Sequence, residues 1–341
     1  MPGSIRRRRR IERPRMIPVS VRFFGRRALQ LVIVVLGIAI TNFFLLRLAP
    51  GDAAQVLAGE AGSATPEYLA ALRKQFGLDQ PLPVQFALYL RNLLSLNLGF
   101  SFRQGLPVLE LIAQRLPATL LLMGTSITFA LLVGSAMGVA AARRAGRATD
   151  TVISSIALLF YATPVFWTGI MLIVVFSVWL DWLPVGGMTS IERGYTGLAY
   201  LKDVAAHLVI PATTLGLFFL AVYTRLMRAA MIDVQQQDFV RTAVAKGLRP
   251  GRIAYRHVVR NALLPVLTML GVQVGAVLGG AVLVETVFSW PGLGRLAFEA
   301  LFQRDLNLLL GILLCSSVVV VLANAAIDFL YTVLDPRIEL S

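Results

Sequence analysis

Six long apolar segments constrain this chain more than any other feature of its sequence. A helix of about 20 mostly apolar residues is long enough to cross the hydrocarbon core of a bilayer. Hydrophobic residues make up 57% of the chain and its mean hydropathy is +0.74, outside the range of ordinary globular domains. The sequence therefore predicts an all-α integral membrane protein with six transmembrane helices. Their approximate ranges are 28–48, 117–142, 151–180, 207–227, 265–288 and 306–334.

Positive charge is concentrated beside some of these segments. The formal net charge is +14, and ten of the 32 Lys and Arg residues precede Ala28. Clustered arginine is also typical of nucleic-acid binding, but these clusters border apolar spans, as the cytoplasmic loops of membrane proteins do. With the N-terminus inside, the inner segments hold 21 Lys and Arg residues and the outer ones nine. We therefore expect a multi-pass protein in a lipid bilayer, with both termini cytoplasmic and no nucleic-acid partner.

The loop between the first two spans is too long for a simple connection. Residues 49–116 contain apolar side chains at helical spacing over 66–76 and again over 83–96. We expect this loop to form a small helical cap on the outer face. The chain then divides into a basic cytoplasmic N-terminal segment, 1–27, and a transmembrane domain, 28–341.

The inner loop between spans four and five, residues 228–264, also predicts structure of its own. A short helix is expected over 239–246, with Asp238 as its N-cap and Gly247 as the residue that follows it. A second helix is expected over 250–264, because proline suits the first position of a helix. The two helices are predicted to lie on the cytoplasmic surface.

Several kinds of chemistry have no motif in this sequence. There is no Gly-Lys dipeptide, so the phosphate-binding P-loop is missing. There is no Gly-x-Ser-x-Gly sequence, and the chain has two histidines and one cysteine, Cys315. We expect no catalytic residue, no metal site and no cofactor in this chain.

The inner loop carries the pattern that most limits the function. Residues 238–248 read Asp-Phe-Val-Arg-Thr-Ala-Val-Ala-Lys-Gly-Leu. This segment resembles the coupling loop of ABC importer permeases, in the variant of the dipeptide, oligopeptide and nickel family. Such importers in general have Glu-Ala-Ala, three residues and then Gly. Here Arg241, Thr242 and Ala243 occupy the first positions and Gly247 the last.

The resemblance extends over nearly the whole chain after residue 20. One short motif is weak evidence, whereas eight in the family's order indicate membership. Asn307 stands where members often have proline, and the arginine-rich first 15 residues have no counterpart in the family. The eight motifs occupy residues 49–52, 76–82, 98–101, 115–120, 182–184, 285–294, 304–305 and 331–337.

The resemblance implies a pore-forming permease subunit that moves peptides or similar small solutes across a bacterial or archaeal plasma membrane by alternating access. It implies as partners a second homologous permease subunit, two ATP-binding subunits that bind ATP and Mg, and an extracellular or periplasmic solute-binding protein. The short inner helix is then expected to dock in a groove of an ATP-binding subunit. The resemblance assigns this ATPase coupling to Asp238, Arg241, Thr242, Ala243 and Gly247.

Other functions stay open from the residues. Similar permeases carry nickel chelates and other small solutes, so the substrate class is not fixed. An ion-coupled secondary transporter usually has internal repeats and matching broken spans, and neither long loop here has a counterpart in the other half of the chain. A structural membrane scaffold would leave the coupling-loop pattern unexplained. The alternative for the loop itself is an ordinary basic inner loop that only sets orientation, since Arg and Lys are expected there in any case.

Three polar residues inside spans are candidates for the translocation pathway or its gate. Glu285 is expected either to receive a cationic group of the substrate or to pair with Arg295 or an outer-loop arginine, because an unpaired carboxylate in hydrocarbon is costly. Asn324 and Asp328 share one face of the sixth span and are expected either to line the pathway or to join helices by hydrogen bonds. Small residues on the fifth span are expected to form one packed face. These are Gly271, Gly275, Gly279 and Gly280.

Overall fold

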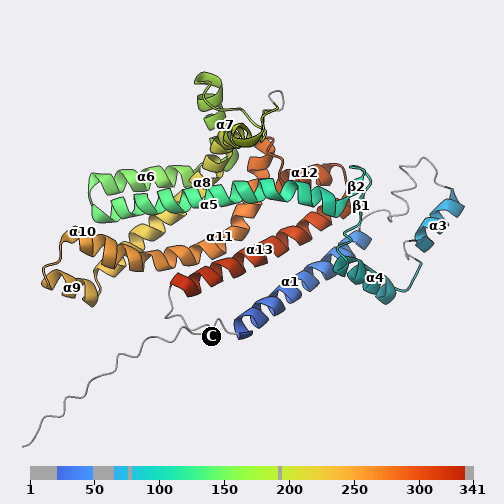
Figure 1. The fold of residues 1–341 in the computed structure, drawn as a ribbon, viewed down its shortest axis with the longest axis horizontal. Helices are drawn as coiled ribbons and strands as arrows, with labels where there is room; N and C mark the ends of the chain where they lie inside the picture. Colours follow the sequence, from blue (N-terminus) through green and yellow to red (C-terminus); the bar gives the residue numbers. More distant parts are fainter. Residues whose placement is uncertain (1–20, 49–64, 76–78, 191–193, 335–341) are drawn as a thin grey trace, which may run out of the picture.

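The computed structural model describes residues 21–48, 65–75, 79–190 and 194–334, and its regular structure is almost entirely helical. Within these ranges, five helices are long and apolar enough to cross a membrane, and a bent helix pair makes a sixth candidate span. The prediction of an all-α membrane protein is confirmed. The long helices are α1 (Val21–Leu48), α5 (Val108–Arg143), α8 (Gly197–Gln235), α11 (Arg260–Val287) and α13 (Leu306–Leu334), and Figure 1 shows them in one elongated body.

The third predicted span is bent, which the sequence analysis does not anticipate. Helix α6 (Ala148–Ala162) is followed by α7 (Val165–Ile173), which continues into the π-helical segment η1 (Val174–Trp179). The chain bends by 103° between α6 and this second segment. The break lies at Thr163, whose backbone is extended with φ −85° and ψ 133°. Its cause is Pro164, because a proline disfavours helical backbone at the residue before it.

Helices α5 and α8 run parallel and approach each other closely along two glycines of α5. A Cβ atom at Gly134 would lie 2.8 Å from the carbonyl oxygen of Leu220, and one at Gly138 would lie 2.6 Å from that of Thr224. Neither site leaves room for a methyl group. Glycines spaced four apart on an apolar helix allow this kind of backbone contact. The contact forms the centre of the largest apolar core, which α11 completes.

The glycines of α11 do not form the single packed face that was expected. Gly271 and Gly275 face α13, because Cβ atoms there would lie 3.5 Å from Ile327 and 3.9 Å from Val320. Gly280 instead faces Leu215 of α8 at 3.2 Å, and a Cβ atom at Gly279 would have no neighbour within 4 Å in the part of the chain that is described. The prediction of one packed face is therefore wrong for Gly279 and Gly280, because neighbouring positions on a helix point in different directions.

The predicted cap between the first two spans contains two helices, α3 (Pro66–Gln75) and α4 (Leu82–Leu94), close to their expected ranges. A hairpin that was not predicted follows, in which β1 (Phe100–Ser101) pairs antiparallel with β2 (Leu106–Pro107). Helix α4 packs on α1 through Phe43, whose ring lies 5.2 Å from that of Phe86. Asn42 of α1 donates a hydrogen bond of 3.1 Å to the Leu310 carbonyl oxygen of α13.

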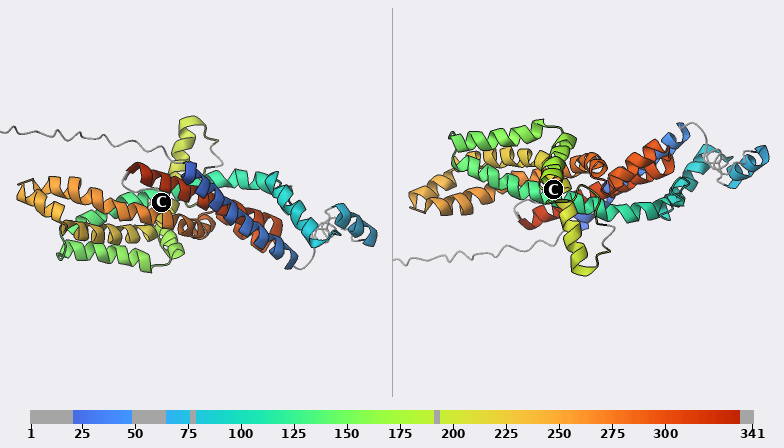
Figure 2. Two further views of the ribbon diagram at one scale, coloured as in Figure 1. Left: turned by 90° about the horizontal axis from the view of Figure 1, so that it is seen from below. Right: turned by 90° about the horizontal axis from the view of Figure 1, so that it is seen from above.

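The inner-loop helices lie at the opposite end of the molecule from this cap (Figures 1 and 2). They are α9 (Asp238–Ala245), then α10 (Pro250–Arg252) and the π-helical segment η3 (Ile253–Val259). The predicted second helix does not end at Leu264. It runs through Pro265 into the fifth span, so that 250–287 is one helix. Proline does not end it there, because neighbouring groups tolerate a proline within a membrane helix.

We expect Gly138→Ala to destabilise the fold, because the added methyl group must push α5 away from α8. Overpacking of this kind typically costs about 1–3 kcal/mol. Thermal unfolding of the purified protein in detergent should show a lower midpoint temperature. Gly124→Ala is the matched control on α5, since a Cβ atom there would have no neighbour within 4 Å in the described part of the chain. Equal midpoints for the two variants would contradict the close approach.

Candidate functional site

The short helix α9 is held to the body of the protein by one face. Val240 and Ala243, three positions apart, are both buried in the main core. Asp238 is the first helical residue, and Gln237 takes the N-cap position without a side-chain hydrogen bond, so the N-cap prediction is wrong by one residue. The Asp238 carboxylate still lies in the first turn, where the helix dipole favours negative charge.

Gly247 ends α9, as predicted. Its φ is +72°, a left-handed conformation that glycine adopts without strain. The Gly247 N–H donates to the Val244 carbonyl oxygen at 2.9 Å, and the Leu248 N–H donates to that of Ala243 at 3.3 Å. This pair of bonds is the Schellman motif, which satisfies carbonyl groups at a helix end. The chain can then reverse direction within three residues and begin the next helix at Pro250.

The other face of α9 is open to solvent. Asp238, Arg241, Thr242 and Gly247 are exposed, and the ion pair between Arg241 and Asp238, at 3.4 Å, is a surface pair of little energetic weight. Two large apolar side chains share this exposure: Phe239 is 40% exposed and Val244 is 60% exposed. Exposed apolar groups rimmed by polar ones are typical of protein–protein contact surfaces. Of the five predicted coupling residues, Ala243 alone faces the core.

The helix after the turn is tied to α5. Arg143, the last residue of α5, donates a hydrogen bond of 3.1 Å to the Tyr255 hydroxyl and lies 5.5 Å from the centre of its ring. Ile253 and Val258 on either side are buried in the main core. The loop between spans four and five is therefore attached to both α5 and α8.

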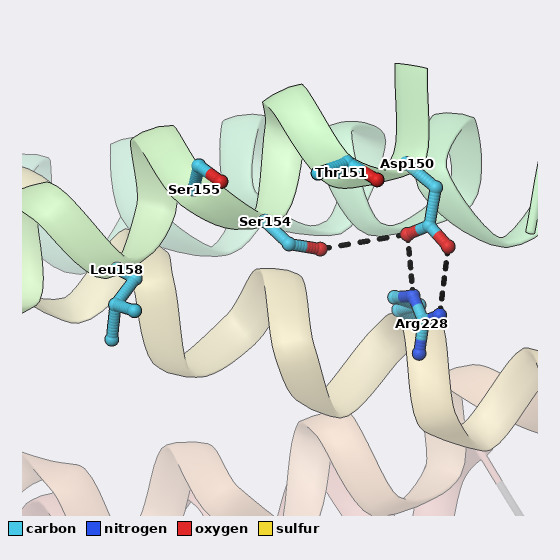
Figure 3. Close-up of a pocket in the computed structure, with 6 residues that line it drawn as sticks. All are labelled: Asp150, Thr151, Ser154, Ser155, Leu158 and Arg228. Carbon is cyan, nitrogen blue, oxygen red and sulfur yellow. Dashed lines mark hydrogen bonds and ion pairs between the residues drawn. The ribbon is translucent and has the colours of Figure 1, made fainter. Parts of the chain in front are cut away.

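A second attachment nearby was missed by the sequence analysis. Arg228 of α8 donates two hydrogen bonds to Asp150 of α6, from Nε to Oδ1 at 2.6 Å and from Nη2 to Oδ2 at 2.8 Å (Figure 3). The Gly146 N–H donates to Oδ2 at 2.9 Å, and the Asp150 side chain is only 7% exposed. The partners are 78 residues apart, so nothing local in the sequence reveals the pair.

Glu285 lies near the end of α11 that is remote from α9, and it is fully buried. Its Oε1 accepts a hydrogen bond of 2.6 Å from the Thr119 hydroxyl, and its Oε2 accepts one of 2.9 Å from the backbone N–H of Arg295. The backbone N–H of Gly294 also donates to the carboxylate. Glu285 thereby joins α5 to the first turn of α12 (Leu293–Phe302), where backbone N–H groups lack partners within the helix.

The expected ion pair between Glu285 and the Arg295 side chain is absent from the described structure. The Arg295 guanidinium instead pairs with Glu299 of its own helix, with 2.8 Å between Nε and Oε1. Backbone N–H groups bind the Glu285 carboxylate in place of the guanidinium, because the turn after α11 brings the start of α12 back over the carboxylate. A role for Glu285 in the gate or in substrate contact stays a prediction.

Asn324 and Asp328 both lie on α13. The Asn324 Oδ1 atom is buried, and no hydrogen-bond donor reaches it within the described ranges. Its neighbours along the helix, Val320 and Ile327, face the glycines of α11, which places Asn324 near that contact. The Asp328 side chain lies outside what the structure describes, so a pathway role for the two residues stays a prediction.

Comparison with known proteins supports the resemblance seen in the coupling loop. Residues 118–340 match the family described as binding-protein-dependent transport system inner membrane component, and residues 20–123 match the N-terminal part of such membrane components. The chain belongs to this family. It is therefore a multi-pass inner membrane subunit of a transporter and not an enzyme, and such permeases work with ATP-binding and substrate-binding partners.

The permease is similar to named relatives over most of its length. It is 39% identical to a probable peptide ABC transporter permease of Sinorhizobium fredii (92% of this chain, 98% of that one). It is 40% identical to the oligopeptide transport system permease AppB of Bacillus subtilis (92% and 98%). It is 38% identical to the dipeptide transport system permease DppB of Escherichia coli K12 (94% and 99%).

Solved structures share the fold of the permease. Two crystal forms of the MetNI methionine ABC transporter, in inward-facing conformations, match with TM-scores of 0.52 and 0.54 at 16% sequence identity. Each match covers 66% of this chain and 96% of the other. At this identity the similarity concerns the fold, and it supports an arrangement of helices like that of an ABC transporter permease.

We expect Glu285→Ala to destabilise the permease, because it leaves the N–H groups at the start of α12 without their acceptor. A buried donor left unsatisfied costs about 1–3 kcal/mol. Glu285→Gln should cost less, since its amide oxygen can still accept a hydrogen bond. Thermal unfolding in detergent should rank the midpoints as wild type, Gln variant and Ala variant. A wild-type midpoint for the Ala variant would show that the carboxylate does not hold α12.

Proposed function

We propose that this permease is one of two pore-forming subunits of an ABC importer for peptides or similar small solutes. The observation that carries the proposal is the exposed face of α9, presented at one end of the molecule by a rigid turn at Gly247. Peptides are favoured over nickel chelates because the three relatives named above are peptide permeases. A second homologous permease, two ATP-binding subunits that bind ATP and Mg, and a solute-binding protein complete the assembly.

The proposed mechanism is alternating access driven through α9. A partner that grips the exposed face of α9 also moves α8, which precedes it by two residues, and the helix of 250–287, which follows it. These are long helices of 39 and 38 residues. A displacement at α9 is passed along them to the far end of α11, where Glu285 holds α12 on α5. The chain itself binds and guides, and forms no covalent bond.

The coupling role predicts a specific defect for Gly247→Val. Valine strains the left-handed backbone at φ +72° by about 1–2 kcal/mol, which should distort the end of α9. We expect the variant to insert in the membrane but to recover less ATP-binding subunit in pull-downs and to show slower ATP-dependent uptake. Gly251→Val is the matched control, since a Cβ atom there meets no neighbour within 4 Å among the described residues and no positive φ is involved. Normal recovery and uptake in Gly247→Val would contradict the role of this turn.

The proposed orientation places α9 and both termini in the cytoplasm and the cap outside. In a Cys315→Ser background, a membrane-impermeant maleimide added to intact cells should label an Asp79→Cys variant and leave a Lys246→Cys variant unlabelled. Both sites are exposed in this chain, and expression without the ATP-binding subunits leaves Lys246 uncovered, so accessibility then reports the side of the membrane. Lys246→Cys should react only after the cells are permeabilised. Labelling of Lys246→Cys in intact cells would reverse the orientation.

A further inference from the structure

We propose that the ion pair between Asp150 and Arg228 is the joint that carries movement of α9 to the bent pair of α6 and α7. The two are positioning residues, and the inference rests on the proposed function of α9 as the coupling helix. Arg228 lies on α8 two turns before its end at Gln235, and α9 begins three residues further on. A shift of α9 should therefore also move the guanidinium of Arg228, because only a short length of chain separates them.

The geometry of the pair suits the transfer of a displacement. Two parallel hydrogen bonds fix both the distance and the relative orientation of a guanidinium and a carboxylate. The carboxylate also accepts the Gly146 N–H, and the Ser154 hydroxyl lies 3.5 Å from Oδ1. Asp150 is thus fixed in the first turn of α6, as the close-up in Figure 3 shows. The guanidinium of Arg228 therefore has a partner whose position is fixed on α6.

Helix α6 packs on α8 by one face only. Asp150 and Ala157 are its only buried residues, while Val152, Ile156 and Leu159 are exposed. Near its far end, the Tyr161 ring stacks on Phe218 of α8 at 5.3 Å. Packing along one face holds the length of α6 on α8. The bidentate ion pair adds a directional link at its first turn, the point of α6 that lies beside the end of α8 leading to α9.

The bent pair of α6 and α7 connects this ion pair with the end of α11, near Glu285. After the break at Pro164, Gly169 of α7 lies against the end of α11: a Cβ atom there would be 3.0 Å from the Phe288 ring. Phe288 follows Glu285 by less than one turn, and its carbonyl oxygen accepts the Gly187 N–H at 2.7 Å. Contacts thus connect α9, α8, α6, α7 and the end of α11 in sequence. This route is separate from the direct one through the helix of 250–287.

The test uses the complete transporter in proteoliposomes, with its ATP-binding subunits and binding protein, and a peptide that the binding protein carries. ATP hydrolysis and uptake are measured together, and the uptake per ATP hydrolysed is compared between variants. Asp150→Asn keeps the shape and one acceptor oxygen, and Arg228→Gln removes the other charge. The double reversal, Asp150→Arg with Arg228→Asp, restores opposite charges. Arg144→Gln is the matched control. It removes one positive charge, as Arg228→Gln does, from an exposed residue in the turn before α6.

We expect Asp150→Asn and Arg228→Gln to assemble and to hydrolyse ATP near the wild-type rate, with uptake per ATP lowered about ten-fold or more. The double reversal should recover part of that ratio, and Arg144→Gln should leave it unchanged. If both single variants have the wild-type ratio of uptake to ATP hydrolysed, the inference is overturned. ATP-dependent uptake by the wild-type transporter would still uphold the proposed function. Parallel loss of hydrolysis, uptake and assembled complex would also overturn it, because the pair would then only hold the fold. No ATP-dependent uptake by the wild type would overturn the proposed function itself.

Discussion

The close approach of α5 and α8 is the constraint on which the rest of the structure depends. Lipid tails are as apolar as leucine, so helices within a membrane gain little by hiding apolar side chains and must be held by close packing and polar contacts. Gly134 and Gly138 supply the packing, since they allow one backbone to lie directly on the other. Helices α6, α7 and α11 then attach to this pair.

Polar contacts connect the helices around that pair at both ends. Arg228 joins α8 to α6 at the end that carries α9, and Glu285 joins α11 to Thr119 of α5 and to α12 at the other. Both acids are buried and both are fully engaged by donors. These two acids therefore lie where two or three segments meet. A change in the arrangement of the helices would alter their hydrogen bonds.

The sequence predicts the features that depend on local chemistry. The spans follow from apolar length, and Gly247 is identifiable because a short helical pattern ends there. The bend at Pro164 was accessible in principle, since a proline lies within the third apolar segment, and so was the Gly134-x-x-x-Gly138 pattern, which marks a helix contact. The link from Asp150 to Arg228 was not, because only the folded chain brings residues 78 positions apart together. The acceptor role of Glu285 toward backbone groups is hidden for the same reason.

The bend at Thr163 and Pro164 also determines how many times the chain passes through the bilayer. With α6 and α7 as one bent crossing, the number of passes is even, and α1 begins on the same side as α13 ends. Were the pair to enter and leave on one side, the number would be odd and every later helix would be inverted. The membrane side of every later helix, α9 included, thus depends on whether the chain crosses at this connection.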